Sequence, residues 1–347
     1  MRVGVWGWFH TGNFGDELIA LYCCRLVEEL GMRPVVFGMR RELALRHGVE
    51  TVEGLDAFFG SIAFCLFAEG GCLIDVKDSM NKKGERYDEL ADAAERHGVT
   101  LYPFSIGGSG LGEGTRVVGG IERLWERGVC GEAVVRLEGD VALVESFGGE
   151  AIYLPDMLWD AARCFGVGRE RDRYMARPLR LGVNFLRNRI SKRFESFVAD
   201  NLPEGVEIYF VTVNTEERVR GEITARVTSD RVHNFYHRDP LDLLRFVGTL
   251  DLLISGKLHV GLTGLSLGTR FISCRGRDKT RAMLGALGEG LVKRKEMELL
   301  AQLFADPELI PAWDTPWERI AEEKEASRAH AGVLERWALR HGASVGV

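Results

Sequence analysis

MRVGVWGWFHTGNFGDELIALYCCRLVEELGMRPVVF, residues 1–37, is the stretch that decides the fold. Arg2–Trp6 and Arg33–Phe37 are short runs rich in β-branched and aromatic residues, and the longer segment Asp16–Leu30 between them is amphipathic. Two such strands joined by a helix predict a βαβ unit with parallel strands. Because both strands are apolar on both faces, we expect helices on both sides of the sheet.

The same alternation continues along the chain. Further strands are predicted at Ile62–Phe67, Thr100–Phe104, Ala133–Leu137, Ala151–Leu154, Leu179–Phe185, Glu207–Val213, Arg231–Asn234, Leu252–Ser255 and Arg270–Cys274. Helices are predicted at Glu85–His97, Thr115–Arg127, Asp140–Phe147, Lys192–Asn201, Glu216–Thr228, Pro240–Leu250, Val260–Leu267, Lys279–Leu287 and within Trp317–His341.

The segment GVGRERDRYMAR, residues 166–177, has few apolar residues and divides this pattern in two. We therefore predict a first domain at 1–165, a linker at 166–178, a second domain at 179–310 and a helical segment at 311–347 that packs back on the first domain. The economical architecture is two doubly wound α/β domains facing a cleft. In such domains ligands bind outside the carboxyl ends of the strands, so the chemistry is expected there.

Composition excludes several classes of protein. Hydrophobic residues make up 46% of the chain and charged residues 28%, which is too apolar for a disordered chain. The net charge of −6 gives no overall attraction for nucleic acid. The longest apolar run, Ile62–Ala68, is far shorter than the ~20 residues of a membrane span. The seven cysteines form no C-x-x-C pair, which favours reduced thiols in a cytoplasmic protein and no zinc site.

The loop GWFHTGNFGDE, Gly7–Glu17, follows the first strand. Gly15 permits close approach of a ligand to the backbone, and the helix that follows presents free N–H groups. We expect Asn13, Gly15, Asp16 and Glu17 to contact the ligand. The structural alternative is that Asp16 caps the helix.

Two further glycine-rich loops follow predicted strands. In AEGGCLID, residues 68–75, we expect Glu69, Gly70, Gly71 and Asp75 to line a substrate loop, with a plain turn as the alternative. SIGGSGLGEG, residues 105–114, has so many glycines that a tight ligand loop explains the entropic cost better than a simple connection.

The segment ISGKLHVGLTGLSLGTRFISCRGRDKTRAML, residues 254–284, has the strongest chemical pattern. Lys257 and His259 flank Leu258, so both are expected to project to the same side of an extended segment. A cation and a titratable group at the carboxyl end of a strand suit an anionic substrate that needs proton transfer. The alternative is a buried structural histidine.

Three more cations follow the next predicted strand, at Arg275, Arg277 and Lys279. They lie near a predicted helix start, where an anion is favoured. The alternative is that these three cations are solvent-exposed surface residues that bind no ligand.

Read together, these segments resemble the polysaccharide pyruvyl transferase family. The resemblance depends on short motifs in the family's order, spread over residues 3–288. They are Asn13–Glu17 for N-x-G-D-E, Gly70–Asp75 for G-G-x-x-x-D, Leu154–Asp156 for a proline-aspartate step, Ser255–His259 for S-x-R-L-H, and Gly268–Arg270 for G-x-P.

The resemblance implies two Rossmann-like domains of the glycosyltransferase-B type. It also implies transfer of the carboxyvinyl group of phosphoenolpyruvate, the co-substrate, to saccharide hydroxyls, which gives a pyruvate ketal on a surface polysaccharide. His259 would be the acid/base, Lys257 would replace the family's arginine beside the donor, and Arg136 would be a further donor contact. The acceptor would be a saccharide, either free or linked to a lipid. The enzyme would be cytoplasmic, and with a lipid-linked acceptor it would associate peripherally with the inner face of the membrane.

The alternatives come from different classes. The first is a glycosyltransferase of the same architecture that uses a nucleotide sugar, with Arg275, Arg277 and Lys279 holding the diphosphate and His259 as base. The second is a non-catalytic, glycan-binding protein. A dehydrogenase fits poorly, because the first loop lacks the G-x-G-x-x-G spacing. Oligomeric state is not predicted by the sequence.

Overall fold

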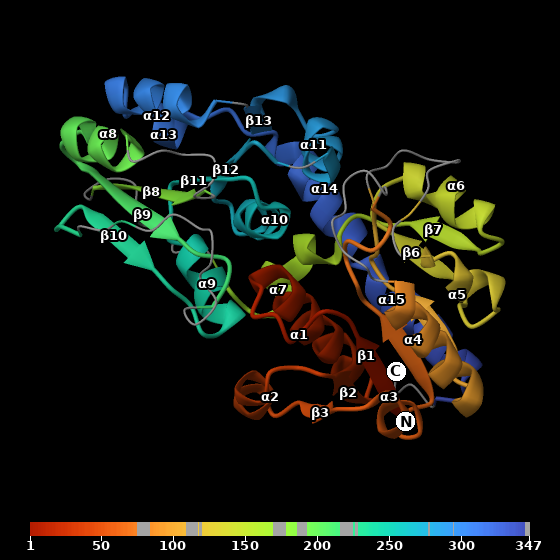
Figure 1. Cartoon of the computed structure of the whole chain (residues 1–347). Coiled ribbons are helices and arrows are strands. Elements are labelled where there is room, and N and C mark those ends of the chain that lie inside the picture. Colours follow the sequence, from red (N-terminus) through yellow and green to blue (C-terminus); the bar gives the residue numbers. More distant parts are fainter. Residues whose placement is uncertain are drawn as a thin grey trace. The chain divides into compact units, whose positions relative to one another are not determined.

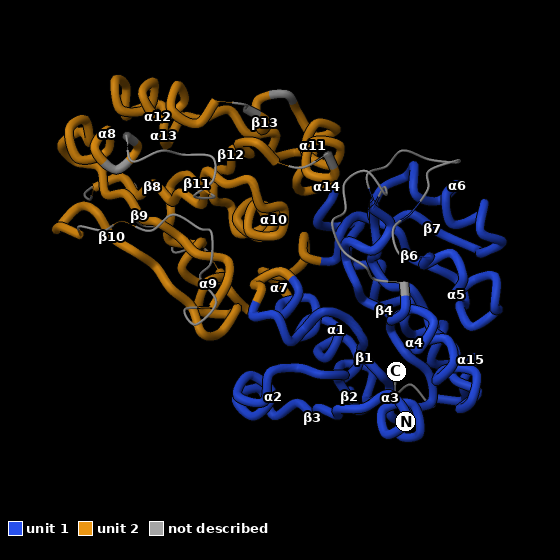
Figure 2. The backbone as a smooth tube through the Cα atoms, viewed as in Figure 1, with its two compact units in different colours: residues 1–12, 16–157, 323–347 blue, residues 13–15, 158–322 orange. Residues whose placement is uncertain are grey.

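The computed structural model describes residues 1–74, 84–108, 117, 120–168, 178–185, 193–215, 225, 228–276, 278–293 and 295–343. The chain forms two compact units, coloured separately in Figure 2. Unit 1 comprises Met1–Gly12, Asp16–Met157 and Glu323–Val347, and unit 2 comprises Asn13–Gly15 and Leu158–Glu322. Residues 169–177 of the predicted linker lie outside the described residues.

Unit 1 contains a parallel sheet of five strands in the order β3-β2-β1-β4-β5 (Figure 1). The strands are β1 (Arg2–Trp6), β2 (Arg33–Phe37), β3 (Glu50–Val52), β4 (Phe64–Phe67) and β5 (Leu101–Pro103). A parallel pair, β6 (Ala133–Val135) and β7 (Ala151–Tyr153), lies beyond β5, and a bridge from Ile106 to Val135 connects to it. The strand order reverses between β1 and β4, which makes that point the topological switch point of the sheet.

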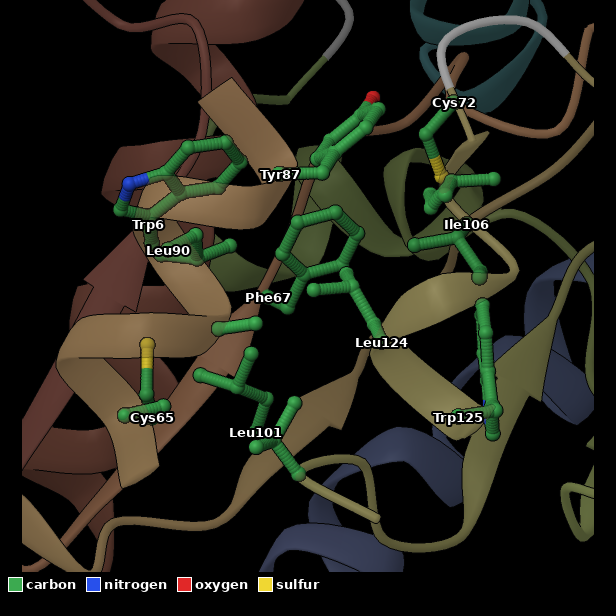
Figure 3. Close-up of a cluster of buried hydrophobic side chains, with 14 of the residues drawn as sticks. Trp6, Cys65, Phe67, Cys72, Tyr87, Leu90, Leu101, Ile106, Leu124 and Trp125 are labelled. Carbon is green, nitrogen blue, oxygen red and sulfur yellow. The ribbon is translucent and has the colours of Figure 1, made fainter. Parts of the chain in front are cut away.

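Helices of unit 1 cover both faces of this sheet. They are α1 (Phe14–Glu29), which begins in unit 2, α2 (Arg41–His47), α3 (Leu55–Phe59), α4 (Gly84–His97), α5 (Arg123–Glu126), α6 (Gly139–Ser146) and α15 (Ala329–Arg340). On one face, alternate strand residues pack with α4 and α5 in a single apolar cluster (Figure 3). Its members include Trp6, Cys65, Phe67, Leu101, Tyr87, Leu90, Leu124 and Trp125.

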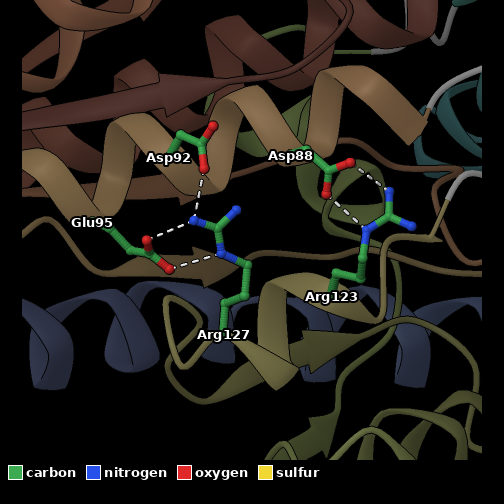
Figure 4. A network of polar contacts seen from close by, with 5 residues as sticks. All are labelled: Asp88, Asp92, Glu95, Arg123 and Arg127. Atoms are coloured by element: carbon green, nitrogen blue, oxygen red, sulfur yellow. Dashed lines mark hydrogen bonds and ion pairs between the residues drawn. The ribbon is translucent and has the colours of Figure 1, made fainter.

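Two arginines of the α5 region pair with carboxylates along α4 (Figure 4). Arg123 donates to Asp88 at 2.7 Å, and Arg127 reaches Asp92 at 2.7 Å and Glu95 at 2.6 Å. The side chains in these pairs are 29–54% exposed, so water screens their attraction and they contribute little to stability. The buried cluster beneath them therefore holds α4 and α5 on the sheet.

The C-terminal helix α15 packs on the opposite face of the first sheet. The Trp337 ring stacks on Tyr102 at 4.5 Å, and its Nε1 donates to Glu132 at 2.9 Å. His341 stacks on Phe64 at 4.9 Å. An aromatic layer thus attaches α15 to the first sheet.

Unit 2 contains a parallel sheet of six strands in the order β10-β9-β8-β11-β12-β13. The strands are β8 (Leu179–Asn184), β9 (Val206–Val211), β10 (Val232–Phe235), β11 (Leu252–Ser255), β12 (Arg270–Cys274) and β13 (Val292–Lys293). Counted within the unit, the order is 3-2-1-4-5-6, that of a Rossmann fold. Its switch point lies between β8 and β11.

Helices also cover both faces of the second sheet. They are α7 (Ala161–Cys164), α8 (Arg193–Asn201), α9 (Pro240–Val247), α10 (Leu258–Ser266), α11 (Asp278–Gly285), α12 (Glu296–Ala305), α13 (Leu309–Ala312) and α14 (Trp317–Ser327), the last of which ends in unit 1. α8, α12 and α13 share one apolar cluster with the strands. On the other face α10 lies so close that a Cβ on Gly261 would meet the Phe271 ring at 2.3 Å.

The predicted fold class of two Rossmann-like α/β domains is confirmed. Strands β1, β2, β11 and β12 have the predicted bounds, whereas β3 and β13 were not predicted. The helix predicted at Thr115–Arg127 is wrong in extent, since its described part is α-helical only at Arg123–Glu126. Most of the helix predicted at Glu216–Thr228 lies outside the described residues. No helix in the described part of the chain is long and apolar enough to cross a membrane.

Candidate functional site

A chain of polar contacts lies at the switch point of the second sheet. Asn184 ends β8 and Ser255 ends β11, and both side chains are at least 98% buried. Asn184 Nδ2 donates to the Val211 carbonyl oxygen at 2.8 Å, and Ser255 Oγ donates to Asn184 Oδ1 at 3.0 Å. Ser255 Oγ also accepts from the backbone N–H of Lys257 at 3.0 Å. Buried polar groups joined in this way fix the carboxyl ends of three strands and the turn that follows β11.

This turn leads directly into α10. Gly256 passes close to β12, where a Cβ would lie 2.9 Å from the Cys274 carbonyl oxygen. Lys257 has extended backbone at the N-cap position, and its side chain makes no capping hydrogen bond, since an ammonium cannot accept one. The first turn of α10 therefore combines amide N–H groups with the lysine charge, an arrangement that favours an anion.

His259 lies in this first turn. The expectation that Lys257 and His259 share an extended segment is wrong, because α10 begins at Leu258, two residues before the predicted start. His259 packs against Gly15, where a Cβ would lie only 1.9 Å from the histidine Nδ1. No residue with a side chain fits at Gly15 while His259 keeps this position.

The segment Asn13–Gly15 is joined to the end of β9 by backbone contacts within unit 2. Phe14 N–H donates to the Val213 carbonyl at 2.8 Å, and Asn13 pairs with Asn214 in an antiparallel bridge. Asn13 Oδ1 accepts from the Gly15 N–H at 3.0 Å, so Asn13 caps α1. The alternative that gave the capping role to Asp16 is therefore wrong.

Two of the three predicted downstream cations can be placed. Arg275 follows β12 with a left-handed backbone (φ +52°), a conformation that costs a non-glycine residue about 1 kcal/mol or more. Its Nε lies 2.8 Å from Glu296 Oε2, and the guanidinium is 44% exposed. Lys279 is half-buried near the start of α11, and Arg277 lies outside the described residues.

Arg136, the other predicted donor contact, is in unit 1. Its Nη1 donates to Asp156 Oδ2 at 2.8 Å, and both side chains are about 1% exposed. A Cβ on Gly70 or on Gly107 would approach the Arg136 side chain to 3.0 and 2.7 Å. The buried arginine therefore explains glycines in two of the predicted ligand loops, and Arg136 forms an internal ion pair.

The remaining predicted contacts also lie in unit 1. Glu17 is fully buried and pairs with Arg40, whose Nη2 donates to Glu17 Oε2 at 2.9 Å. Glu69 is 4% exposed and accepts from the Tyr87 hydroxyl at 3.0 Å. Asp16 and Gly71 are half-buried, and Asp75 lies outside the described residues.

The sequence analysis missed two residues of unit 2 that hold predicted site residues in place. Asn184 and Glu296 were not singled out, because each acts through a partner distant in sequence, Ser255 and Arg275 respectively. Within the described ranges, no group of three or more His, Cys, Asp and Glu side chains is arranged to hold a metal ion.

No protein-family model matches the sequence, and no curated protein matches it. Solved structures match over nearly the whole chain. They include UDP-GlcNAc 2-epimerase from Neisseria meningitidis bound to UDP-GlcNAc (TM-score 0.58, 12% identity, 98% of this chain and 100% of that chain). The HepE protein of Anabaena in complex with UDP and glucose also matches (0.55, 9%, 97% and 99%), as does CalG4, the calicheamicin glycosyltransferase (0.51, 10%, 99% and 99%).

At these identities the likeness establishes the fold, which is that of the glycosyltransferase-B class of two-domain α/β proteins. The identification with polysaccharide pyruvyl transferases is wrong: the matched structures include UDP-N-acetylglucosamine 2-epimerases and glycosyltransferases, and no family model supports it. The first of the short motifs that suggested that family, Asn13–Glu17, has a structural explanation here. Asn13 caps a helix, Gly15 makes room for His259, and Glu17 pairs with Arg40.

Proposed function

We propose that the protein is a glycosyltransferase that uses a nucleotide-diphosphate sugar, bound at the carboxyl edge of the second sheet. The observation that carries this proposal is the series of hydrogen bonds that joins Asn184, Ser255 and Lys257 at the switch point, directly before the first turn of α10. In a Rossmann-type sheet this is where a ligand is expected. Helix N–H groups and a lysine select an anionic ligand, and a diphosphate fits that requirement.

The comparisons support the nucleotide part of the proposal. Neighbours of the same fold were solved with UDP, with UDP and glucose, or with UDP-GlcNAc. Their likeness to this chain establishes fold, so the ligand is carried over as a proposal and is supported by the charge at Lys257.

In the proposed reaction, Lys257, Arg275 and His259 have different roles. The acceptor hydroxyl oxygen forms a bond to the anomeric carbon while the bond from that carbon to the diphosphate breaks, and the electron pair leaves with the diphosphate. Lys257 and the α10 amides stabilise the charge on this leaving group. Arg275 adds positive charge beside the next strand, partly balanced by Glu296. His259 accepts the proton of the acceptor hydroxyl.

Binding is the first test of this proposal. We would measure thermal unfolding of the full-length chain with UDP, UDP-GlcNAc, UDP-glucose and other nucleoside diphosphates, with phosphoenolpyruvate as a comparison anion. A ligand at a hundred times its Kd stabilises the native state by ~2.7 kcal/mol, which shifts the midpoint by several degrees. We expect a shift with at least one nucleotide and none with phosphoenolpyruvate.

Variants show whether binding uses the proposed edge. Loss of a hydrogen bond to a charged group costs about 1.5–3 kcal/mol, so Lys257→Ala should raise the nucleotide Kd roughly ten- to a hundredfold. Lys295→Ala is the matched control, because Lys295 is also an N-cap residue, of α12, but it is exposed and pairs with Glu298 three residues later. Equal nucleotide affinity in the two variants would contradict the assignment of Lys257.

Epimerisation is a second candidate, because structures described as UDP-GlcNAc 2-epimerases match with TM-scores of 0.58–0.60, whereas the two described as glycosyltransferases match at 0.53 and 0.51. Incubation with UDP-GlcNAc and no acceptor distinguishes the two reactions. Inversion at C2 with the nucleotide sugar otherwise intact would identify an epimerase, whereas release of UDP that depends on an added acceptor would identify a transferase. Binding without either product would favour the non-catalytic alternative.

A further inference from the structure

Arg86 is a half-buried cation near the carboxyl edge of the first sheet. It is the third residue of α4, and its guanidinium carbon lies 3.9 Å from the centroid of the Trp8 ring and 4.8 Å from that of Trp6. It donates no hydrogen bond and forms no ion pair to any residue that the structure describes. Burial lowers the pKa of the guanidinium, although an arginine stays charged at neutral pH.

Arg86 lies near the switch point of the first sheet. Trp6 is the last residue of β1, and Glu69 follows β4 by two residues, so both lie at the switch point of the first sheet. In open α/β sheets the crevice outside this point is where ligands bind. Arg86 lies over the indole rings at this point.

The neighbouring carboxylate is engaged elsewhere. Glu69 is buried and accepts from the Tyr87 hydroxyl, and burial together with the Glu69 charge raises the pKa of Tyr87 well above its usual value. Glu69 stabilises the charge of Arg86 at a distance but takes none of its hydrogen bonds. The N–H donors of Arg86 therefore remain available for an acceptor that the described residues do not supply.

We infer that Arg86 is the centre of an oxyanion-binding subsite in unit 1, and that the subsite takes a carboxylate or phosphate group carried by a saccharide. The guanidinium is planar, and when one of its faces lies over aromatic rings its N–H groups still point outward in that plane, which suits two parallel hydrogen bonds to an oxyanion. The stacking on Trp8 also restricts the side chain before binding, which reduces the entropic cost. Under the proposed function this saccharide is the acceptor. The assignment of this saccharide as the acceptor rests on the proposed function, whereas the binding of an oxyanion at Arg86 does not.

The test uses direct binding to the full-length chain. Glucuronate supplies the carboxylate, glucose 1-phosphate supplies the phosphate, and glucose and inorganic phosphate are the controls. Calorimetry measures the Kd, and tryptophan fluorescence reports on the rings under Arg86. We expect saturable binding of one charged sugar, no binding of glucose, and weaker binding of inorganic phosphate. The charged sugar that binds identifies the source of the oxyanion.

Variants on one helix provide the decisive comparison. Arg86→Gln should lower the affinity for the charged sugar by about tenfold or more, and Arg86→Lys should lower it less because the charge remains. Arg96→Gln should leave it unchanged, since Arg96 is exposed on the same helix and pairs with Asp56. The inference is overturned if neither charged sugar saturates, or if Arg86→Gln and Arg86→Lys both bind like the unchanged protein.

The two proposals fail separately. If Arg86→Gln loses the charged sugar and UDP still binds, both proposals are supported. If no nucleoside diphosphate or nucleotide sugar of the panel binds while the Arg86 variants lose the charged sugar, the proposed function is refuted and the oxyanion subsite stands.

Discussion

Replacement of Gly15 by alanine tests the contact between α1 and His259. The new Cβ would lie 1.9 Å from His259 Nδ1, 2.6 Å from its Cγ and 2.8 Å from its Cβ. Rotation of the ring alone cannot relieve the contact, because the histidine Cβ is itself too close. We therefore expect Gly15→Ala to displace His259 and the first turn of α10.

The magnitude follows from two opposing effects. Alanine in a helix is favoured over glycine by about 1 kcal/mol. Forcing extra volume into a packed contact costs about 1–3 kcal/mol. Gly15→Ala should thus lower the free energy of unfolding by up to ~2 kcal/mol. Gly332→Ala is the matched control, because Gly332 is a helical glycine of α15 with nothing within 4 Å of its added Cβ, and it should be stabilising.

The assay is urea unfolding of both variants, followed by a double-mutant cycle with His259→Ala. The two glycine variants should differ in free energy of unfolding by ~1–3 kcal/mol, and removal of the imidazole should recover part of the loss at Gly15. Gly15→Ala should also impair turnover if His259 accepts the proton. Equal stabilisation by both glycine variants, with no coupling to His259, would refute the reasoning.

Two further predictions concern unit 1. Arg136→Met leaves the Asp156 carboxylate buried and unpaired, so it should lower the free energy of unfolding, measured in urea, by about 3–5 kcal/mol. The double variant Arg136→Met/Asp156→Leu should recover most of that loss. A small effect of the single change would contradict a buried ion pair. Burial lowers the pKa of His341 in the folded state, so the unfolded chain binds its proton first as the pH falls. Stability should therefore fall below pH ~6.5, and His341→Phe should lose this part of the pH dependence; an unchanged slope would argue against it.

The sequence by itself determined the fold class. Strands β1, β2, β11 and β12 are buried and lie between glycine-containing or polar turns, so local composition defines both of their ends. The partly buried edge strand β3 and the two-residue β13 have too few apolar residues to give such a signal. Short motifs were less reliable than strands, because a helix cap, a close packing contact and a ligand contact can require the same residue types.

The tertiary structure decided what the polar residues do. Arg136 and Asp156 are twenty residues apart, and pairing buries both, since each charge compensates for the desolvation of the other. Asn184 meets Ser255 across a parallel sheet whose neighbouring strands are distant in sequence. Arg86 reaches Trp8 because α4 packs on the first sheet, and Trp8 lies two residues after the end of β1. Periodicity along the chain reports burial of one segment at a time, whereas pairing between distant charges depends on how the segments pack.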